Sequence, residues 1–121
     1  MSYTDLGAGD LSEVIGANET VVVDFWAQWC GPCRAFGPVF EAAADAHPDV
    51  LFAKVDTEAE PELAAAFQIR TIPTVVVFRD STAVFRRSGL ISAAELDDVL
   101  ARVRDLGMEA VEASGAEVAG A

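Results

Sequence analysis

The stretch from Asp24 to Pro38 reads DFWAQWCGPCRAFGP and contains both cysteines of the chain, Cys30 and Cys33. It overlaps the run Val21–Trp26, whose residues are β-branched or aromatic except for one aspartate. Such a run predicts a strand that is buried on both faces, as in a parallel or mixed sheet. Residues 33–46 are rich in alanine and place apolar side chains at helical spacing, which predicts a helix. The cysteines therefore lie where a buried strand gives way to a helix.

The rest of the chain alternates strand and helix patterns around this stretch. Apolar runs predict strands at 50–55 and 74–78, and residues 83–87 can return antiparallel to the latter after a turn at 79–82. Three capping-box patterns predict further helices: Asp10 with Glu13 before a helix at 11–16, Thr57 with Glu60 before a helix ending near 67, and Ser92 with Glu95 before the last helix. This order predicts an α/β fold, with a central mixed sheet of four to five strands and helices on both faces.

Length and composition limit the class of protein. With 121 residues, 52% of them hydrophobic, the chain has room for one folded domain, which we assign to residues 1–107. Residues 108–121 form an acidic C-terminal tail rich in alanine and glycine. The net charge of -12 argues against nucleic-acid binding, because phosphate contacts need clustered Lys and Arg. No apolar stretch reaches the roughly 20 residues of a membrane span, and MSYTDLGAGD lacks a signal-peptide pattern, so we expect a cytoplasmic protein that does not bind membranes.

The two cysteines could bind zinc, form a structural disulfide or act in redox chemistry. A structural zinc site needs four ligands, and beside the cysteines the chain offers a single histidine, His47, so no metal site is expected. A structural disulfide that closes so short a loop stabilises little and is unusual in a reducing cytosol. Redox exchange fits best, because it needs one thiolate to attack a disulfide and a second thiol nearby to resolve the mixed disulfide.

The order of the two cysteines predicts their roles. Cys30 comes just before the helix, where unsatisfied backbone N–H groups and the positive helix end favour a thiolate. Pro32 suits the first turn of that helix, because no N–H bond is needed there. We therefore predict that Cys30 is the catalytic nucleophile and that Cys33, one step further in and less exposed, is the resolving thiol.

Asp24 is a carboxylate in a buried strand, which costs several kcal/mol unless it is paired or protonated. It could simply be hydrogen-bonded in the core. Beside a dithiol, however, a proton acceptor near neutral pH is what the resolving step requires. Lys54, in the apolar strand FAKVD, is the expected charge partner, since the two strands can be neighbours. We count Asp24 and Lys54 with the two cysteines as candidate catalytic residues.

Four segments, in this order and at these separations, resemble the thioredoxin family closely. VDFWAQWCGPC (residues 23–33) resembles the active-site strand and loop, and AKVD (53–56) resembles the strand that carries the family's buried lysine. IRTIPT (69–74) resembles the segment with the family's cis-proline, and Gly89 in RRSGL falls where the family has a glycine beside the active site. The resemblance covers about residues 10–105 and implies the thioredoxin fold.

The resemblance implies a protein-disulfide reductase that binds no cofactor. Cys30 would attack a disulfide in a client protein, and Cys33 would release the reduced client. Asp24 would accept the Cys33 proton through water, with Lys54 tuning it. A flat apolar surface would dock the client, formed by Trp29, Gly31, Pro32, Ile72, Pro73 and Gly89, with a cis Pro73 presenting backbone to an extended client segment. Electrons would come from NADPH through thioredoxin reductase, and we expect a monomer.

Two other functions stay open at this point. One is an exported oxidase or isomerase of the same fold, although Gly31-Pro32 resembles the reducing members and oxidising relatives typically have His there. The other is a binding module or co-chaperone in which the dithiol is secondary. The chain also departs from the family pattern, because its first strand, within Met1–Leu6, is expected to be short. Ser81-Thr82 stand in a hairpin where the family usually has Gly, and the acidic tail is extra.

Overall fold

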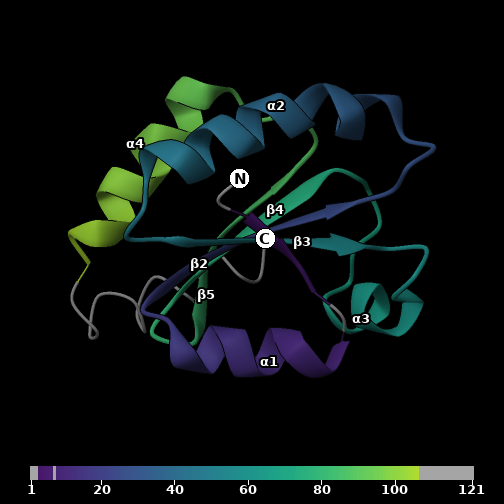
Figure 1. Ribbon diagram of the computed structural model, residues 1–121, viewed down its shortest axis with the longest axis horizontal. Helices are drawn as coiled ribbons and strands as arrows, with labels where there is room; N and C mark the ends of the chain where they lie inside the picture. The colour runs from purple at the N-terminus through teal and green to yellow at the C-terminus, as the bar shows by residue number, and fades with distance from the viewer. Residues whose placement is uncertain (1–2, 7, 107–121) are drawn as a thin grey trace.

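A computed structural model describes residues 3–6 and 8–106 of the chain. In chain order, its elements are β1 (Tyr3–Asp5), α1 (Ala8–Ala17), β2 (Thr20–Trp26), α2 (Gly31–Ala46), β3 (Leu51–Asp56), α3 (Pro61–Ala66), β4 (Thr74–Arg79), β5 (Thr82–Ser88) and α4 (Ala93–Arg104). Figure 1 shows the sheet between two layers of helices, with α2 and α4 on one face and α1 and α3 on the other. The predicted α/β fold with a mixed, helix-covered sheet is confirmed.

The sheet has the strand order β1-β3-β2-β4-β5, so β2 lies at its centre. The β1–β3 and β2–β3 pairs are parallel, whereas β4 is antiparallel to both β2 and β5. The register places Asp24 of β2 opposite Lys54 of β3 on one side and opposite Val75 of β4 on the other. The sequence prediction that Asp24 and Lys54 occupy neighbouring strands is therefore confirmed.

The side chains of β2 alternate between two hydrophobic cores. Val22 packs with Phe36 in the core beneath α2 and α4. Val23 and Phe25 pack with Leu11 in the core on the side of α1 and α3. Because helices cover both faces, β2 is buried throughout except at its last residue. The prediction of a strand buried on both faces is confirmed, and this burial is what makes a carboxylate in β2 unusual.

The three predicted capping boxes had different outcomes. Ser92 and Glu95 form the complete box at the start of α4, where the Ser92 hydroxyl accepts from the Glu95 N–H at 3.1 Å. The box at Thr57 is wrong: α3 starts only at Pro61, and the Thr57 hydroxyl donates to the Trp26 carbonyl instead. The box at Asp10 is also wrong, because α1 begins two residues earlier and Asp10 lies within its first turn. A pattern of two residues does not fix where a helix begins when neighbouring backbone groups compete for the same side chain.

The hairpin between β4 and β5 turns through Asp80 and Ser81, since Arg79 already pairs with Thr82. Both turn residues have positive φ, 48° at Asp80 and 69° at Ser81. Positive φ at both central positions is the type I′ turn, whose twist matches that of the flanking strands. The turn therefore adopts the usual hairpin geometry without the glycine that normally makes it easy to form.

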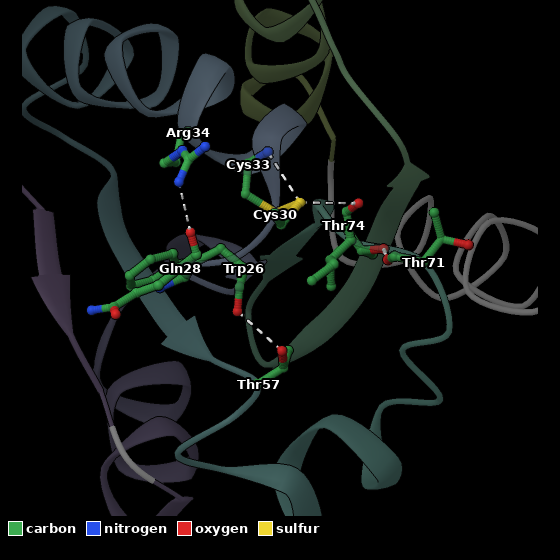
Figure 2. The surroundings of a disulfide bond; sticks show 9 residues. Trp26, Gln28, Cys30, Cys33, Arg34, Thr57, Thr71 and Thr74 are labelled. Carbon is green, nitrogen blue, oxygen red and sulfur yellow. Dashed lines mark hydrogen bonds between the residues drawn. A yellow bond between two sulfur atoms is a disulfide. The ribbon is translucent and has the colours of Figure 1, made fainter.

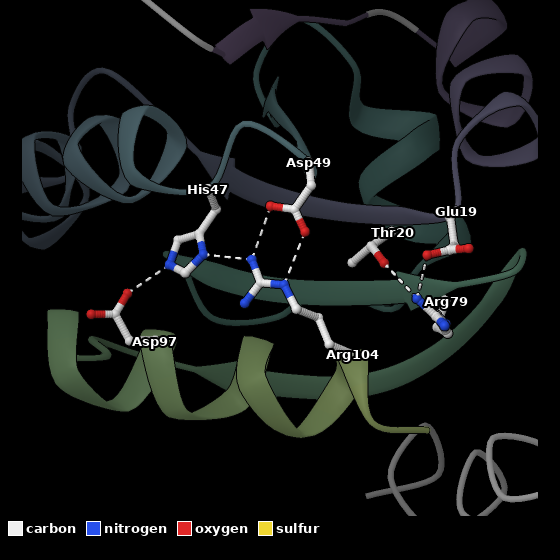
Figure 3. Close-up of polar contacts among 7 residues, drawn as sticks. All are labelled: Glu19, Thr20, His47, Asp49, Arg79, Asp97 and Arg104. Atoms are coloured by element: carbon white, nitrogen blue, oxygen red, sulfur yellow. Dashed lines mark hydrogen bonds and ion pairs between the residues drawn. The ribbon is translucent and has the colours of Figure 1, made fainter. Parts of the chain in front are cut away.

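The C-terminal end of α2 is tied to α4 by a polar network that Figure 3 shows. His47, the C-cap residue of α2, lies 2.8 Å from an Asp97 oxygen through Nε2 and 2.7 Å from Arg104 Nη2 through Nδ1. Arg104 also donates to both oxygens of Asp49, at 2.9 and 3.0 Å. These contacts fix the far end of the helix whose near end carries the cysteines.

The chain ends were predicted in part. The first strand is short, as expected, with three residues in β1. The last helix, predicted from the capping box at Ser92, ends at Arg104, with Asp105 as its C-cap. The acidic tail assigned to residues 108–121 lies outside the described residues.

Candidate redox site

Cys30 and Cys33 form a disulfide at the N-terminal end of α2, with their Cα atoms 5.2 Å apart. Cys30 is the N-cap residue, so its backbone is still extended (φ -87°, ψ 109°) while its side chain faces the first turn. The Cys33 backbone N–H points at the Cys30 sulfur, with 3.2 Å between nitrogen and sulfur (Figure 2). The helix start therefore presents a hydrogen-bond donor to Cys30 in the manner of a capping interaction.

Burial does not distinguish the two cysteines. Each is 3% exposed, so the expectation that Cys33 is the less exposed of the two is not met in this disulfide form. Capping position does distinguish them, because in the described contacts it is the Cys30 sulfur that receives a backbone N–H. The same sulfur lies 3.7 Å from the carbonyl oxygen of Ile72, in the loop before β4. Cys30 is thus the sulfur that meets both the helix end and the neighbouring loop.

Asp24 is almost completely buried, with 1% of its surface exposed. Neither of its carboxylate oxygens has a hydrogen-bond partner among the described residues. Burial without a partner disfavours the charged form, and it raises the pKa of Asp24 to about 7, while the nearby charge of Lys54 opposes the rise. Asp24 is therefore a carboxyl group that can exchange a proton near neutral pH.

Lys54 does not form the expected contact ion pair with Asp24, although the two residues are opposite each other in the register. Its ammonium instead lies over two aromatic rings, 4.6 Å from the ring centre of Tyr3 and 5.4 Å from that of Trp26. A cation near the face of an aromatic ring is attracted by the ring's quadrupole. Lys54 thus influences Asp24 through space rather than through a hydrogen bond.

The loop before β4 and the end of β5 meet beside the disulfide. The Ile72–Pro73 peptide bond is cis, as the resemblance implied. The Gly89 N–H donates to the Pro73 carbonyl at 2.8 Å, and Gly89 has a φ of +91°, a conformation that favours glycine. This hydrogen bond joins the backbones of Pro73 and Gly89, two residues of the expected docking surface.

The remaining residues of the expected docking surface are exposed or partly exposed. The Trp29 side chain is 67% exposed, Gly31 and Pro32 are exposed, and Ile72 is half-buried against the two cysteines. Pro73 itself is buried, so it contributes to this surface through its backbone rather than its ring. Trp29, which precedes Cys30 in the chain, is one of two large apolar residues that are strongly exposed among the described residues.

Several residues around the site were not singled out from the sequence. Leu90, which follows Gly89 in the chain, is 56% exposed. Thr57 bonds the Trp26 carbonyl through both its backbone N–H and its hydroxyl, and Arg34 donates to the Gln28 carbonyl at 3.2 Å (Figure 2). Tyr3, beneath Lys54, was also missed, because only the pairing of β1 with β3 brings it there. Of these residues, only Leu90 could have been found from the sequence, as an apolar residue next to Gly89.

Within residues 3–6 and 8–106 no group of three or more His, Cys, Asp or Glu side chains is arranged to hold a metal ion. No helix within them is long and apolar enough to cross a membrane.

Comparison with known proteins gives one consistent family. The sequence pattern of the family Thioredoxin matches residues 8–102. The chain is 48% identical to putative thioredoxin 2 of Streptomyces coelicolor over 116 residues, which cover 96% of this chain and 87% of that protein. It is 42% identical to the thioredoxin of Mycobacterium tuberculosis strain H37Rv over 94 residues, or 74% of this chain and 81% of that one.

Solved structures agree with this assignment. The thioredoxin of Fasciola hepatica aligns with a TM-score of 0.76 at 40% identity, covering 83% of this chain and 97% of that one. A point-mutant thioredoxin from Halobacterium salinarum aligns with a TM-score of 0.79 at 34% identity, covering 87% of this chain and 92% of that one. The disulfide at the start of α2 is the redox centre that such a protein needs, and its own cysteines do the chemistry. The chain belongs to the thioredoxin family and is a thiol–disulfide oxidoreductase, a protein-disulfide reductase that works without a bound cofactor.

Proposed function

We propose that the protein reduces client disulfides through a mixed disulfide at Cys30. In the reduced form, the Cys30 thiolate attacks one sulfur of the client disulfide, and the other client sulfur leaves as a thiol. The Cys33 thiolate then attacks the Cys30 sulfur, and the second client thiol leaves. Two electrons pass to the client, and the protein ends with the Cys30–Cys33 disulfide that the structure contains.

The contact between the Cys33 N–H and the Cys30 sulfur carries the assignment of Cys30 as the nucleophile. A hydrogen bond from the backbone at a helix N-terminus stabilises negative charge on the sulfur, which lowers the pKa of such a thiol. Cys33 lies inside the first turn, where its own sulfur has no described backbone donor. The same geometry thus favours attack by Cys30 and leaves Cys33 to resolve the mixed disulfide.

Asp24 is the proposed acceptor for the Cys33 proton, reached through water. Its raised pKa, about 7, suits a group that accepts a proton near neutral pH. Its burial and its lack of a hydrogen-bond partner among the described residues support this role, because a structural carboxylate in the same place would be paired. Lys54 tunes this group from a neighbouring strand.

The client is proposed to dock as an extended segment. Its backbone pairs with the chain around Ile72 and Pro73, while Trp29, Gly31, Pro32 and Gly89 form the apolar floor beside the sulfurs. The position of the Ile72 carbonyl, 3.7 Å from the Cys30 sulfur, supports this arrangement, because a strand paired there passes the nucleophile.

After each turnover the disulfide must be reduced again. We assign this step to thioredoxin reductase, a flavin enzyme that draws electrons from NADPH. The reductase, the client proteins and a cytoplasmic location form one consistent setting, since a reductant needs a reducing compartment. We further propose that the chain acts as a monomer.

Trapping of the mixed disulfide tests the assignment of the two cysteines. A Cys33→Ser variant, reduced and mixed with insulin as the disulfide client, should accumulate a covalent complex that dithiothreitol releases. The matched control, Cys30→Ser, keeps one thiol at the same helix end and should trap little. Equal trapping by the two variants, or more by Cys30→Ser, would contradict the proposed order of attack.

A further inference from the structure

The ammonium of Lys54 is held between two aromatic rings that come from different strands. Tyr3 belongs to β1 and Trp26 to β2, and β3, which carries Lys54, lies between them. The Tyr3 ring is the nearer of the two, at 4.6 Å against 5.4 Å. Tyr3 is itself placed by an edge-on contact with Phe40 of α2, at 6.4 Å between ring centres.

A carboxylate stands on each side of Lys54 in the sheet. The register pairs Lys54 with Asp5 of β1 and with Asp24 of β2, so the three residues form one row across three strands. A lysine in such a row is within reach of Asp24, and a direct hydrogen bond would strongly favour the charged carboxylate. Asp24 accepts no such bond from the described residues. The rings of Tyr3 and Trp26 attract the Lys54 ammonium and so compete with a hydrogen bond to Asp24.

We propose that Tyr3 is a positioning residue, which holds the Lys54 ammonium over its ring and away from the Asp24 carboxylate, so that Asp24 remains a base at neutral pH. The proposal rests on the proposed function in taking Asp24 as the proton acceptor of the resolving step. Tyr3 touches neither sulfur nor client in this account. It acts only through the position of Lys54.

Other charged groups of the described residues lie near this row. Asp5 faces Lys54 from β1, and Asp56 and Glu60 line the same cavity of about 500 Å³ as Lys54 and Trp26. Glu41 of α2 acts on the Tyr3 phenol, whose pKa is raised by burial first and then by Glu41 and Asp5. On the β4 side Asp24 faces the apolar Val75, and α2 contributes the two cysteines at its start.

The ring differs in kind from these carboxylates, several of which a long and flexible lysine side chain can approach. Because the Tyr3 ring stands directly beneath the ammonium, its removal should let Lys54 approach Asp24, while loss of the phenol hydroxyl alone should not.

Titration of the Asp24 carboxyl carbon by ¹³C NMR, in the oxidised full-length protein, tests this directly. Tyr3→Leu should lower the titration midpoint by about half a pH unit, the size expected for loss of an exposed cation–π contact. Tyr3→Phe, which keeps the ring, should titrate like the wild type. Tyr3→Met serves if Tyr3→Leu does not fold.

A double-mutant cycle with Lys54→Met separates positioning from a merely structural effect. In the Lys54→Met background, Tyr3→Leu should leave the midpoint unchanged, because the ammonium that it would release is gone. An equal shift in both backgrounds, or no shift in either, would overturn the proposal. The titration does not depend on turnover, so it decides the role of Tyr3 even if Asp24→Asn shows that Asp24 is not the proton acceptor.

Discussion

Lys54 lies opposite Asp24 in the parallel register of β2 and β3, and yet neither oxygen of Asp24 accepts a hydrogen bond from the described residues. The pair is close enough to interact through space and too far apart to neutralise the buried carboxylate. The protein therefore keeps a carboxyl group whose protonation changes near pH 7 in its interior. Such a group destabilises the fold whenever it is charged. The charged form that the proposed proton transfer needs is therefore the form that lowers the stability of the protein.

The stability of the protein should fall as the pH rises toward and through 7. The pKa of Asp24 is about 7 in the folded chain against a reference value of 3.8, so the folded state binds the extra proton between these pH values. The stabilisation is complete below about pH 4 and is lost above about pH 7. Asp24→Asn removes this dependence and should be more stable than the wild type at pH 8, by up to about 4 kcal/mol.

Urea unfolding at several pH values between about 3.5 and 8.5 brackets this window and measures the difference. Asp98→Asn, which changes an exposed carboxylate on α4, is the matched control and should follow the wild-type curve. Parallel pH profiles for Asp24→Asn and the wild type would show that Asp24 has an ordinary pKa in the folded chain.

The resolving step should be more sensitive to Asp24 than the first attack. Asp24→Asn removes the proton acceptor for Cys33 and should slow release of the client by about a hundredfold, the low end for general acid–base catalysis. The wild-type release rate should rise with pH through about 7, as Asp24 loses its proton, and the variant should lack this rise.

Stopped-flow tryptophan fluorescence, reported by Trp29 beside the sulfurs, can follow both steps. The first attack is isolated in the Cys33→Ser background, where the mixed disulfide cannot resolve. If Asp24→Asn slows both steps equally, Asp24 acts on the site as a whole and not on the Cys33 proton.

The reduction potential of the Cys30–Cys33 pair should lie near about -270 mV, the value known for thioredoxins. Gly31 and Pro32 between the cysteines supply no charge that would favour the thiolate beyond the helix end itself. Equilibration against a glutathione buffer measures the potential, and about 30 mV corresponds to a tenfold change in equilibrium. A value above about -200 mV would suit an oxidase or isomerase better than a reductase.

Ser81→Gly should stabilise the β4–β5 hairpin. Ser81 has a φ of 69°, a conformation that costs a residue with a side chain about 1 kcal/mol and costs glycine almost nothing. The greater freedom of glycine in the unfolded chain offsets part of this gain, so we expect an increase of about 0.5 kcal/mol. Ser81→Ala keeps the strained conformation and is the control. A loss of stability for Ser81→Gly would mean that the serine side chain supports the turn.

The fold could be predicted from the sequence because its signals are local or periodic. The apolar run at β2 and the complete capping box at Ser92 each depend on neighbours within a few residues. The start of α3 was misplaced for the opposite reason, since the Thr57 hydroxyl donates to the carbonyl of Trp26, which is distant in the sequence. A side chain with two possible partners cannot be assigned from its sequence spacing alone.

The candidate site divides in the same way. The two cysteines and Asp24 stand out by type and position, and the register places Lys54 opposite Asp24 as expected. The position of the Lys54 ammonium could not be foreseen, because it depends on Tyr3, which is far from Lys54 in the chain and is joined to β3 only by sheet pairing. A contact between residues on paired strands depends on how the strands are arranged in the sheet, and a short sequence motif does not show this arrangement.

The three-residue strand β1 is synthesised before β3 but can find its place only after β3 has been made, since Tyr3 pairs with Phe52. It is also the shortest of the described strands and lies at the edge of the sheet, where local opening breaks fewer contacts. The ring beneath Lys54 therefore cannot settle before β3 is made, and it belongs to the strand that is among the first to leave during a fluctuation. Each brief detachment of β1 would change the charge environment of Asp24 while the disulfide and its helix remain in place.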